Sequence, residues 1–159
     1  MDYTNDTQRT IYPETMPTGA AASYDVRIAH DLDLWPNDFK LANTIEDFVM
    51  PLDVAGQVMD KSSFARVGVS AYNTWLDPGW RGNLTVELCN HGPNKVHIAR
   101  GDPLVQIVFW RLDAPTLRPY TGKYMDQPRR PVGPRYSRDD GTYEEAELPL
   151  ATPEEYSKA

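Results

Sequence analysis

Fourteen prolines in 159 residues are the strongest constraint on what this chain can fold into. They make up about 9% of the sequence, against a usual value of ~5%. Proline lacks a backbone N–H and its ring breaks the interior of a helix, so their number excludes a fold built on long helices. A chain of this length still buries roughly two thirds of its unfolded surface. We therefore expect one domain with its own core.

Apolar and polar residues alternate in short runs along the chain, which is typical of β-strands. Turn signals such as Pro78-Gly79 separate these runs at intervals of about 8–12 residues. One further stretch, residues 61–70, fits a helical turn followed by a strand. The clearest candidate strands are residues 24–28, 39–45, 54–59, 84–89, 96–98 and 104–112. This spacing predicts an all-β sandwich or barrel.

Composition divides the chain into four parts. Residues 1–21 are polar and predict an N-terminal arm, and residues 22–127 hold the candidate strands. Residues 128–136 contain three prolines and three arginines, which predict an extended, mobile, cationic lid. Residues 137–159 carry seven acidic and two basic residues, so this acidic tail holds −5 of the formal charge of −7.

Charge, cysteine content and hydropathy argue against several classes of function. The chain outside the tail is nearly neutral and lacks the basic face of a nucleic-acid-binding protein. Cys89 is the single cysteine, which excludes a disulfide framework and a zinc site built on several thiolates. His30, His91 and His97 show no ligand spacing, so we expect no protein-built metal site. No apolar run approaches 18 residues and no leader-like segment opens the chain. We expect a cytoplasmic protein, or one in the host cytoplasm if a phage encodes it.

The segment Lys61-Ser62-Ser63-Phe64-Ala65-Arg66 places two hydroxyls, an ammonium and a guanidinium within six residues. Such a cluster supplies many hydrogen-bond donors to anionic oxygens. Alternatively, Ser62 or Ser63 caps the start of the helical turn. The residues alone leave both interpretations open.

The segment from Trp75 to Gly82 contains Asp77-Pro78-Gly79 between two tryptophans. Asp-Pro-Gly is a turn sequence, and a turn is the simplest interpretation. The aromatic faces of Trp75 and Trp80 also suit a sugar or base, and the Asp77 carboxylate suits a sugar hydroxyl. Lys123, in a loop beside Gly122, is either a phosphate contact or an exposed lysine.

Glu87 lies in a run whose alternate residues Leu84, Val86 and Leu88 are apolar. The alternation places Glu87 on the opposite face of the strand from these three. If that face is exposed to solvent, Glu87 is an ordinary polar residue. If it lines a cleft between subunits, partial burial raises the pKa of the carboxyl toward a range that suits general acid–base catalysis.

Taken together, these segments resemble the dCTP deaminase/dUTPase superfamily. The resemblance covers roughly residues 22–135 and implies a distorted β-barrel or jelly-roll of the dUTPase-like type. It also implies a homotrimer with active sites between subunits. The matching segments, in the order typical of the family, are residues 23–27, 51–56, 61–66, 76–82, 84–90, 101–109 and 122–127.

The resemblance implies a role for each candidate residue. Glu87 matches the catalytic carboxylate, while Ser62 and Arg66 match the residues that hold the attacking water and orient that carboxylate. Asp77 matches the carboxylate that binds the deoxyribose 3′-hydroxyl, and Trp80 the aromatic residue beside the sugar. Positions in contact with the triphosphate or near the nucleotide are matched by Lys61, Ser63, Gln106, Tyr120, Lys123 and Gln127.

The implied reaction is the hydrolytic deamination of dCTP to dUTP by a carboxylate without a catalytic metal. Glu87 would take a proton from water, deliver it to the ring N3 and help to protonate the leaving amine. Zinc deaminases use a His-x-Glu and Pro-Cys-x-x-Cys signature that this chain lacks. Mg²⁺ is expected to enter bound to the triphosphate.

Several alternatives remain open at this point. The chain could be a bifunctional dCTP deaminase/dUTP diphosphatase, a plain dUTPase, or a non-catalytic nucleotide-binding or regulatory module. Ordinary dUTPases usually carry an apolar residue at the position of Glu87, which favours deamination. Family deaminases have a longer hairpin than residues 69–76, and its backbone reads the pyrimidine. Activity on a modified pyrimidine triphosphate is therefore a further alternative.

Overall fold

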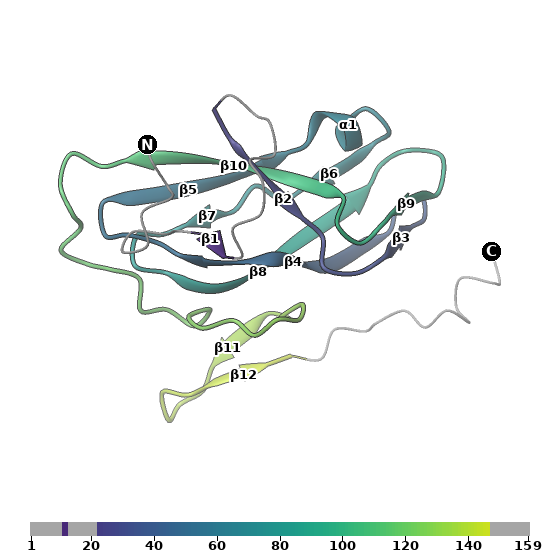
Figure 1. Ribbon diagram of the computed structural model, residues 1–159. Coiled ribbons are helices and arrows are strands. Elements are labelled where there is room, and N and C mark those ends of the chain that lie inside the picture. The colour runs from purple at the N-terminus through teal and green to yellow at the C-terminus, as the bar shows by residue number, and fades with distance from the viewer. Residues whose placement is uncertain (1–10, 13–21, 147–159) are drawn as a thin grey trace.

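The structure, a computed structural model, describes residues 11–12 and 22–146 and is nearly all β (Figure 1). This confirms the predicted all-β class. No helix in the described part of the chain is long and apolar enough to cross a membrane. The elements are β1 (Ile11–Tyr12), β2 (Tyr24–Arg27), β3 (Leu32–Leu34), β4 (Phe39–Val49), β5 (Val54–Asp60), α1 (Ser62–Ala65), β6 (Val69–Ala71), β7 (Trp75–Leu76), β8 (Arg81–Asn90), β9 (Val96–Ile98), β10 (Pro103–Arg111), β11 (Arg135–Ser137) and β12 (Tyr143–Glu145).

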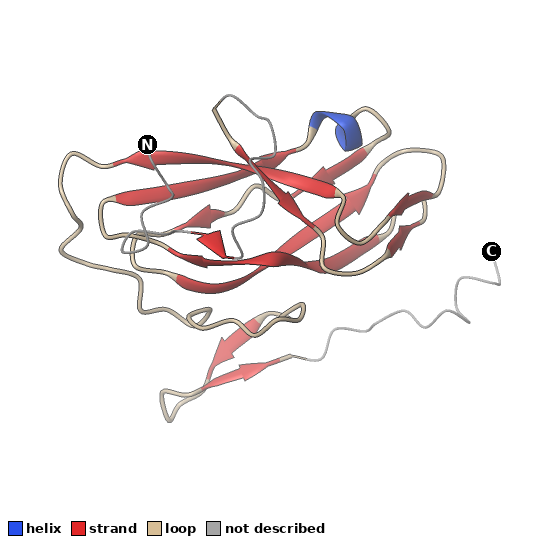
Figure 2. Cartoon of the chain, in the orientation of Figure 1, coloured by secondary structure: helices blue, strands red, loops and turns tan. Residues whose placement is uncertain are grey.

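Two four-stranded sheets form the body of the protein (Figure 2). One has the strand order β1-β4-β8-β6 and the other β2-β10-β5-β7, and every pairing is antiparallel. Two smaller ladders join β3 to β9 and β11 to β12. Within the described residues the ladders are open sheets and do not close into a barrel.

The long strands coincide with the runs of alternating residues, because each run has one face in the core. The helical turn and strand predicted within residues 61–70 are α1 and β6. The sequence analysis predicts none of the short strands β3, β7, β11 and β12, although it does predict β9, which has only three residues. Of the predicted arm at 1–21, only β1 is described. The predicted acidic tail starts at Ser137, the last residue of β11, and includes β12. Its residues 147–159 lie outside the described residues.

The hydrophobic core lies between the two large sheets. β5 and β10 contribute Val58, Val105 and Ile107, and β8 contributes Val86 and Leu88, all of them almost fully buried. Successive side chains of a strand point to opposite faces, so the residues between these point away from the core. On β8 this places Thr85 and Glu87 on the other face, as the sequence predicts for Glu87.

The β4–β8 ladder contains an irregularity with a buried polar side chain opposite it. The register shifts between Asn43 and Asp47, where β4 bulges away from its partner. Asn83 is fully buried opposite the bulge, and its side-chain amide donates to the carbonyl oxygens of Thr44 and Glu46. These bonds satisfy the backbone groups that the bulge leaves unpaired.

The same bulge carries Glu46 into the interior, where its side chain is fully buried. Its carboxylate accepts hydrogen bonds from Nε of Arg27 at 2.7 Å and from the backbone N–H of Arg27 at 3.1 Å. Arg27 belongs to β2 in the other sheet, so the ion pair joins the two sheets. Burial, reinforced by the nearby Glu46 carboxylate, raises the pKa of Tyr24 to about 12.

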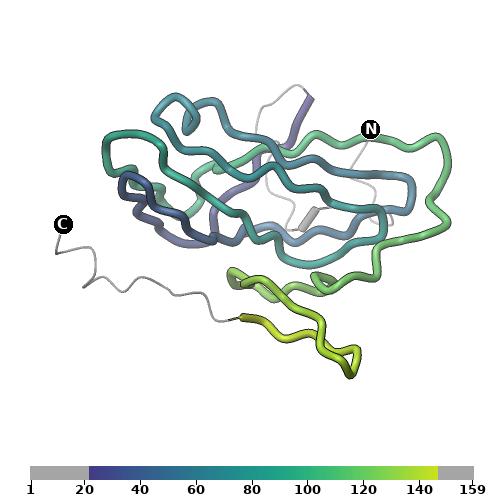
Figure 3. Tube along the Cα trace, turned by 180° about the vertical axis from the view of Figure 1, so that it is seen from behind, coloured from purple at the N-terminus to yellow at the C-terminus, as the bar shows by residue number. Residues whose placement is uncertain are grey.

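The chain after β10 wraps around one end of the two sheets. It then runs past the sheet that contains β4 and β8 and ends in the β11–β12 hairpin (Figure 3). We call residues 128–134 of this segment the strap. Helix α1 lies on the far side of the two sheets from this hairpin (Figures 1 and 3).

Replacement of Glu46 tests the ion pair between the sheets. Glu46→Gln is expected to lower the free energy of unfolding by about 3–5 kcal/mol, because it leaves the charge of Arg27 without a partner in a buried site. Urea denaturation followed by tryptophan fluorescence measures this change. The matched control is Glu144→Gln, which breaks an exposed pair with Arg138 and is expected to cost less than about 1 kcal/mol. Equal losses in the two variants would contradict a structural role for the buried pair.

Candidate active site

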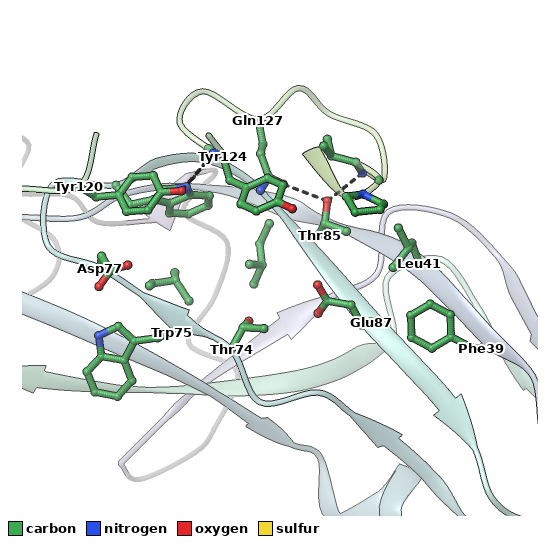
Figure 4. Close-up of a pocket in the computed structure, with 16 residues that line it drawn as sticks. Phe39, Leu41, Thr74, Trp75, Asp77, Thr85, Glu87, Tyr120, Tyr124 and Gln127 are labelled. Carbon is green, nitrogen blue, oxygen red and sulfur yellow. Dashed lines mark hydrogen bonds between the residues drawn. The ribbon is translucent and has the colours of Figure 1, made fainter. Parts of the chain in front are cut away.

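A cavity of about 440 Å³ opens between β8, the loop before β8 and the strap (Figure 4). Its volume is in the range of small-molecule sites. Its lining is mainly apolar and aromatic, with a few polar groups. The lining residues are Phe39, Leu41, Thr74, Trp75, Leu76, Asp77, Trp80, Leu84, Thr85, Glu87, Tyr120, Tyr124, Gln127, Val132, Gly133 and Pro134.

Glu87 projects into the middle of this cavity from β8 (Figure 4). Its Oε2 atom is buried and has no hydrogen-bond partner among the described residues. Burial raises the pKa of the Glu87 carboxyl above its ordinary value. A desolvated carboxyl without a protein partner can exchange a proton with a bound water or ligand. The structure therefore argues against the solvent interpretation of Glu87, while the predicted cleft between subunits stays a prediction.

Asp77 and Trp80 reach the cavity from one tight turn. The backbone N–H of Trp80 donates to the carbonyl oxygen of Asp77 at 3.0 Å, and Gly79 between them has a φ of 84°. A positive φ favours glycine, so Asp-Pro-Gly does form the predicted turn. The turn also presents the Asp77 carboxylate and the Trp80 ring to the cavity. The structural and the functional interpretations of this segment are compatible.

Tyr120 and Tyr124 close the same end of the cavity. The Tyr120 hydroxyl accepts a hydrogen bond from the backbone N–H of Tyr124 at 3.1 Å, and Nε1 of Trp80 donates to the carbonyl oxygen of Tyr124 at 2.7 Å. Trp80 is almost fully buried and packs against Phe48 of the core. The aromatic end of the cavity is thus anchored to the hydrophobic core.

The strap covers the cavity next to Glu87. Val132 is buried, and Gly133 and Pro134 also line the cavity. Arg130 donates two hydrogen bonds to Glu145 of β12, and the backbone N–H of Gly133 donates a third. The Arg130 guanidinium holds the pKa of Glu145 at about 2. The segment predicted as a lid therefore lies over the cavity, and these contacts join it to the β11–β12 hairpin.

Residues 61–66 do not reach this cavity. Ser62, Ser63 and Arg66 are exposed on or beside α1, and Lys61 forms an ion pair with Asp25. Helix α1 begins after Lys61 without any side-chain capping bond, so the predicted capping role of Ser62 or Ser63 is wrong. The hydroxyls and the guanidinium thus stay available on the surface, away from Glu87.

Gln106 and Lys123, the other two predicted contacts, also lie outside the cavity lining. The Gln106 side chain accepts a hydrogen bond from Ser23 and donates one to the carbonyl oxygen of Asp60, so it links neighbouring segments. Nζ of Lys123 donates to the carbonyl oxygen of Arg135 at 2.6 Å. Within one chain, the cavity brings together five of the eleven predicted site residues, namely Asp77, Trp80, Glu87, Tyr120 and Gln127.

The structure adds several lining residues to the predicted set. Thr85 was detectable in principle, because it lies two residues before Glu87 and shares its face of the strand. Phe39 and Leu41 lie on β4 beside Glu87, and Leu41 is the direct cross-strand neighbour of Glu87. The strap residue Val132 carries no local signal, because its position depends on how the chain returns to the sheets.

Comparison with known proteins identifies the family of this chain. The family model described as dCTP deaminase-like matches residues 4–112. A protein of Methanoculleus marisnigri named dCTP deaminase, dUMP-forming is 41% identical over 106 residues, which are 63% of this chain and 56% of the relative. A protein of Pyrococcus horikoshii named dCTP deaminase is 42% identical over 94 residues, 59% of this chain and 60% of the relative. The chain thus spans less than two thirds of the length of either relative.

Solved structures share the fold. A dUTPase from phage phi11 of S. aureus, described as coordinating a structural Mg(II) ion, superposes with a TM-score of 0.56 at 18% identity. The superposition covers 69% of this chain and 89% of that one. At this identity the likeness concerns the fold alone. With more than half of its length matched by the family model, the chain belongs to the dCTP deaminase-like family and has a dUTPase-like fold.

Proposed function

We propose that this protein deaminates dCTP to dUTP by hydrolysis, with Glu87 as the proton-transferring group. The observation that carries the proposal is the buried Oε2 atom of Glu87, which faces a nucleotide-sized cavity and has no partner among the described residues. The names of the relatives in Methanoculleus and Pyrococcus support dCTP as the substrate.

The reaction follows from the groups around the cavity. Glu87 removes a proton from water as the oxygen attacks C4 of the cytosine ring. The proton passes to N3, and a further proton transfer releases ammonia as C4 becomes a carbonyl. Proton transfer by a positioned carboxylate typically contributes about 10²–10⁴-fold to the rate. The Asp77 carboxylate accepts a hydrogen bond from the 3′-hydroxyl of the sugar, and Trp80 packs beside the sugar. Tyr120 and Gln127 contact the phosphates.

We propose that the remaining groups come from a second copy of the chain, in a homotrimer whose active sites lie between subunits. Ser62 and Arg66 are exposed and lie outside the Glu87 cavity, so one chain alone supplies only part of the site. An aromatic pair, Phe39 and Tyr72, lies beside Glu87 with its rings 5.9 Å apart and about half exposed. This pair offers an apolar surface against which residues 61–66 of a second copy can pack, which would bring Lys61 and Ser63 to the phosphates. Gln106 has a supporting role, since its side chain is hydrogen-bonded to Ser23 and Asp60.

Mg²⁺ enters this proposal as part of the substrate. Among the described residues no group of three or more His, Cys, Asp or Glu side chains could hold a metal ion. Mg²⁺ prefers phosphate oxygens and water over an all-protein cage. The strap and Lys123 would then close over the Mg²⁺-nucleotide, so residues 128–136 act as a lid.

A second candidate is the bifunctional reaction from dCTP to dUMP. It is favoured by the Methanoculleus relative, which is named dUMP-forming. In that case Asp77 also positions water for attack on the α-phosphate, and pyrophosphate is released. A plain dUTPase, a nucleotide-binding module, or a deaminase of modified pyrimidine triphosphates would each give a different set of products.

A product assay tests the proposal. With Mg²⁺ and dCTP, the protein is expected to release ammonia and form dUTP; Glu87→Gln is expected to lower the rate about 10²–10⁴-fold while dCTP still binds. The exposed variant Glu144→Gln should match the wild type. Pyrophosphate from dCTP or dUTP would favour the bifunctional enzyme or the dUTPase. Saturable dCTP binding without any product would contradict catalysis on dCTP.

The raised pKa of Glu87 predicts a pH dependence of stability. The folded chain retains the Glu87 proton at pH values where the unfolded chain has already lost it, so the contribution of Glu87 to the free energy of unfolding falls as pH rises above the ordinary glutamate pKa. Glutamine has no proton to lose. Glu87→Gln should therefore match the wild type near about pH 3.5 and exceed its free energy of unfolding at about pH 7. Urea denaturation at both pH values measures this, and a variant no more stable than the wild type at pH 7 would mean that Glu87 is not desolvated.

A further inference from the structure

Thr85 is a buried polar residue of the cavity to which the proposed reaction assigns no role. It lies on β8 two residues before Glu87, on the same face of the strand, and is 7% exposed. Its hydroxyl is the meeting point of two segments that are far from β8 in the sequence, the strap and the loop that carries Gln127 (Figure 4).

The hydrogen bonds of Thr85 have a fixed direction. The backbone N–H of Val132 donates to Oγ1 of Thr85 at 3.0 Å, and a backbone N–H can only donate. The single proton of the hydroxyl is directed to Oε1 of Gln127 at 2.9 Å. Because the carbonyl end of the Gln127 amide faces Thr85, its NH₂ end faces away. This NH₂ group has no hydrogen-bond partner among the described residues and is free to donate to a ligand.

The main chain of Gln127 is held independently of Thr85. Its carbonyl oxygen accepts a hydrogen bond from the N–H of Asn83 at 3.0 Å, and it forms a parallel bridge with Gly82. Gly82 has a φ of 142°, and a Cβ there would lie 2.6 Å from the nitrogen of Gln127. Gly82 thus permits the close approach of the two backbones. Only the direction of the Gln127 amide depends on the Thr85 hydroxyl.

The strap has two kinds of attachment. Arg129 pairs with Asp47 and Arg130 with Glu145, and both arginine side chains are more than half exposed. The exposed Arg129 pair contributes little and weakens with salt. The Arg130 pair joins the strap to β12 of the hairpin that follows it, and not to the two sheets. The bond from Val132 to Thr85 is buried, and an unpaired buried N–H costs about 1–3 kcal/mol. Thr85 is therefore the attachment that joins the strap to the cavity itself.

We propose that Thr85 is a positioning residue that couples closure of the strap to the orientation of the Gln127 amide in the cavity. With the strap closed, Val132 fixes the hydroxyl, and the hydroxyl fixes the amide with its NH₂ group toward the ligand. With the strap open, the hydroxyl loses its donor and the amide loses its preferred direction. The nature of the ligand rests on the proposed function, whereas the link between Thr85 and the strap does not.

Proteolysis without nucleotide tests the link to the strap. Thr85→Val keeps the shape of the side chain and removes the hydroxyl, while Thr85→Ser keeps the hydroxyl. Trypsin is expected to cleave Thr85→Val after Arg129 about 5- to 30-fold faster than the wild type, because cleavage follows the open population. Thr85→Ser should be close to the wild type. If Thr85→Val fails to fold, Thr85→Ala makes the same test. Cleavage of the hydroxyl-free variant at the wild-type rate would overturn the proposal.

Binding of dCTP tests the link to Gln127. All variants are made in the Glu87→Gln background, so that dCTP is not consumed, and affinity is measured by calorimetry. Thr85→Val and Gln127→Leu should each weaken binding about 5-fold, and the double variant should be no weaker than the Gln127 variant alone. Additive losses would overturn the proposed relay. If the protein does not bind dCTP at all, the proposed function fails, and the trypsin experiment still decides whether Thr85 holds the strap.

Discussion

The pleat of β8 divides the side chains of one strand between the hydrophobic core and the cavity. Val86 and Leu88 pack between the two sheets, while Thr85 and Glu87 face the strap. A shift of one residue in the β4–β8 register would exchange these two sets and bury the wrong ones. The packing that stabilises the fold therefore also sets the position and the desolvation of Glu87. The bulge in β4 and the buried amide of Asn83 keep that register.

The cavity within one chain is only part of the proposed site. It holds a desolvated carboxyl, a turn with an aspartate and a tryptophan, and the tyrosines that close one end. The donor-rich segment of residues 61–66 lies on the far side of the sheets from the β11–β12 hairpin (Figure 1). The proposed homotrimer would resolve this separation, because each subunit would then supply its donors to the cavity of its neighbour.

Much of the fold follows from sequence patterns, and five of the eleven predicted site residues line the cavity. Alternation identifies the long strands and places Glu87 opposite the core, and Asp-Pro-Gly identifies the turn that carries Asp77. Contacts that depend on tertiary packing are not predictable in this way. The side-chain amide of Gln106 donates to the carbonyl oxygen of Asp60 on the neighbouring strand, because β10 lies between β2 and β5. The contact of Val132 with Thr85 spans 47 residues of sequence and depends on a path that no local pattern encodes.

The central claim is that Glu87 of one subunit works with Ser62 and Arg66 of another. Mixing subunits tests it most directly: Glu87→Gln and Arg66→Ala chains, each inactive alone, are unfolded together, refolded and assayed for ammonia release from dCTP. Shared sites predict recovery to about one quarter of the wild-type activity, because random assembly then gives some sites both native residues. Refolding either variant alone should recover nothing. A mixture as inactive as its two parents would contradict a site shared between subunits.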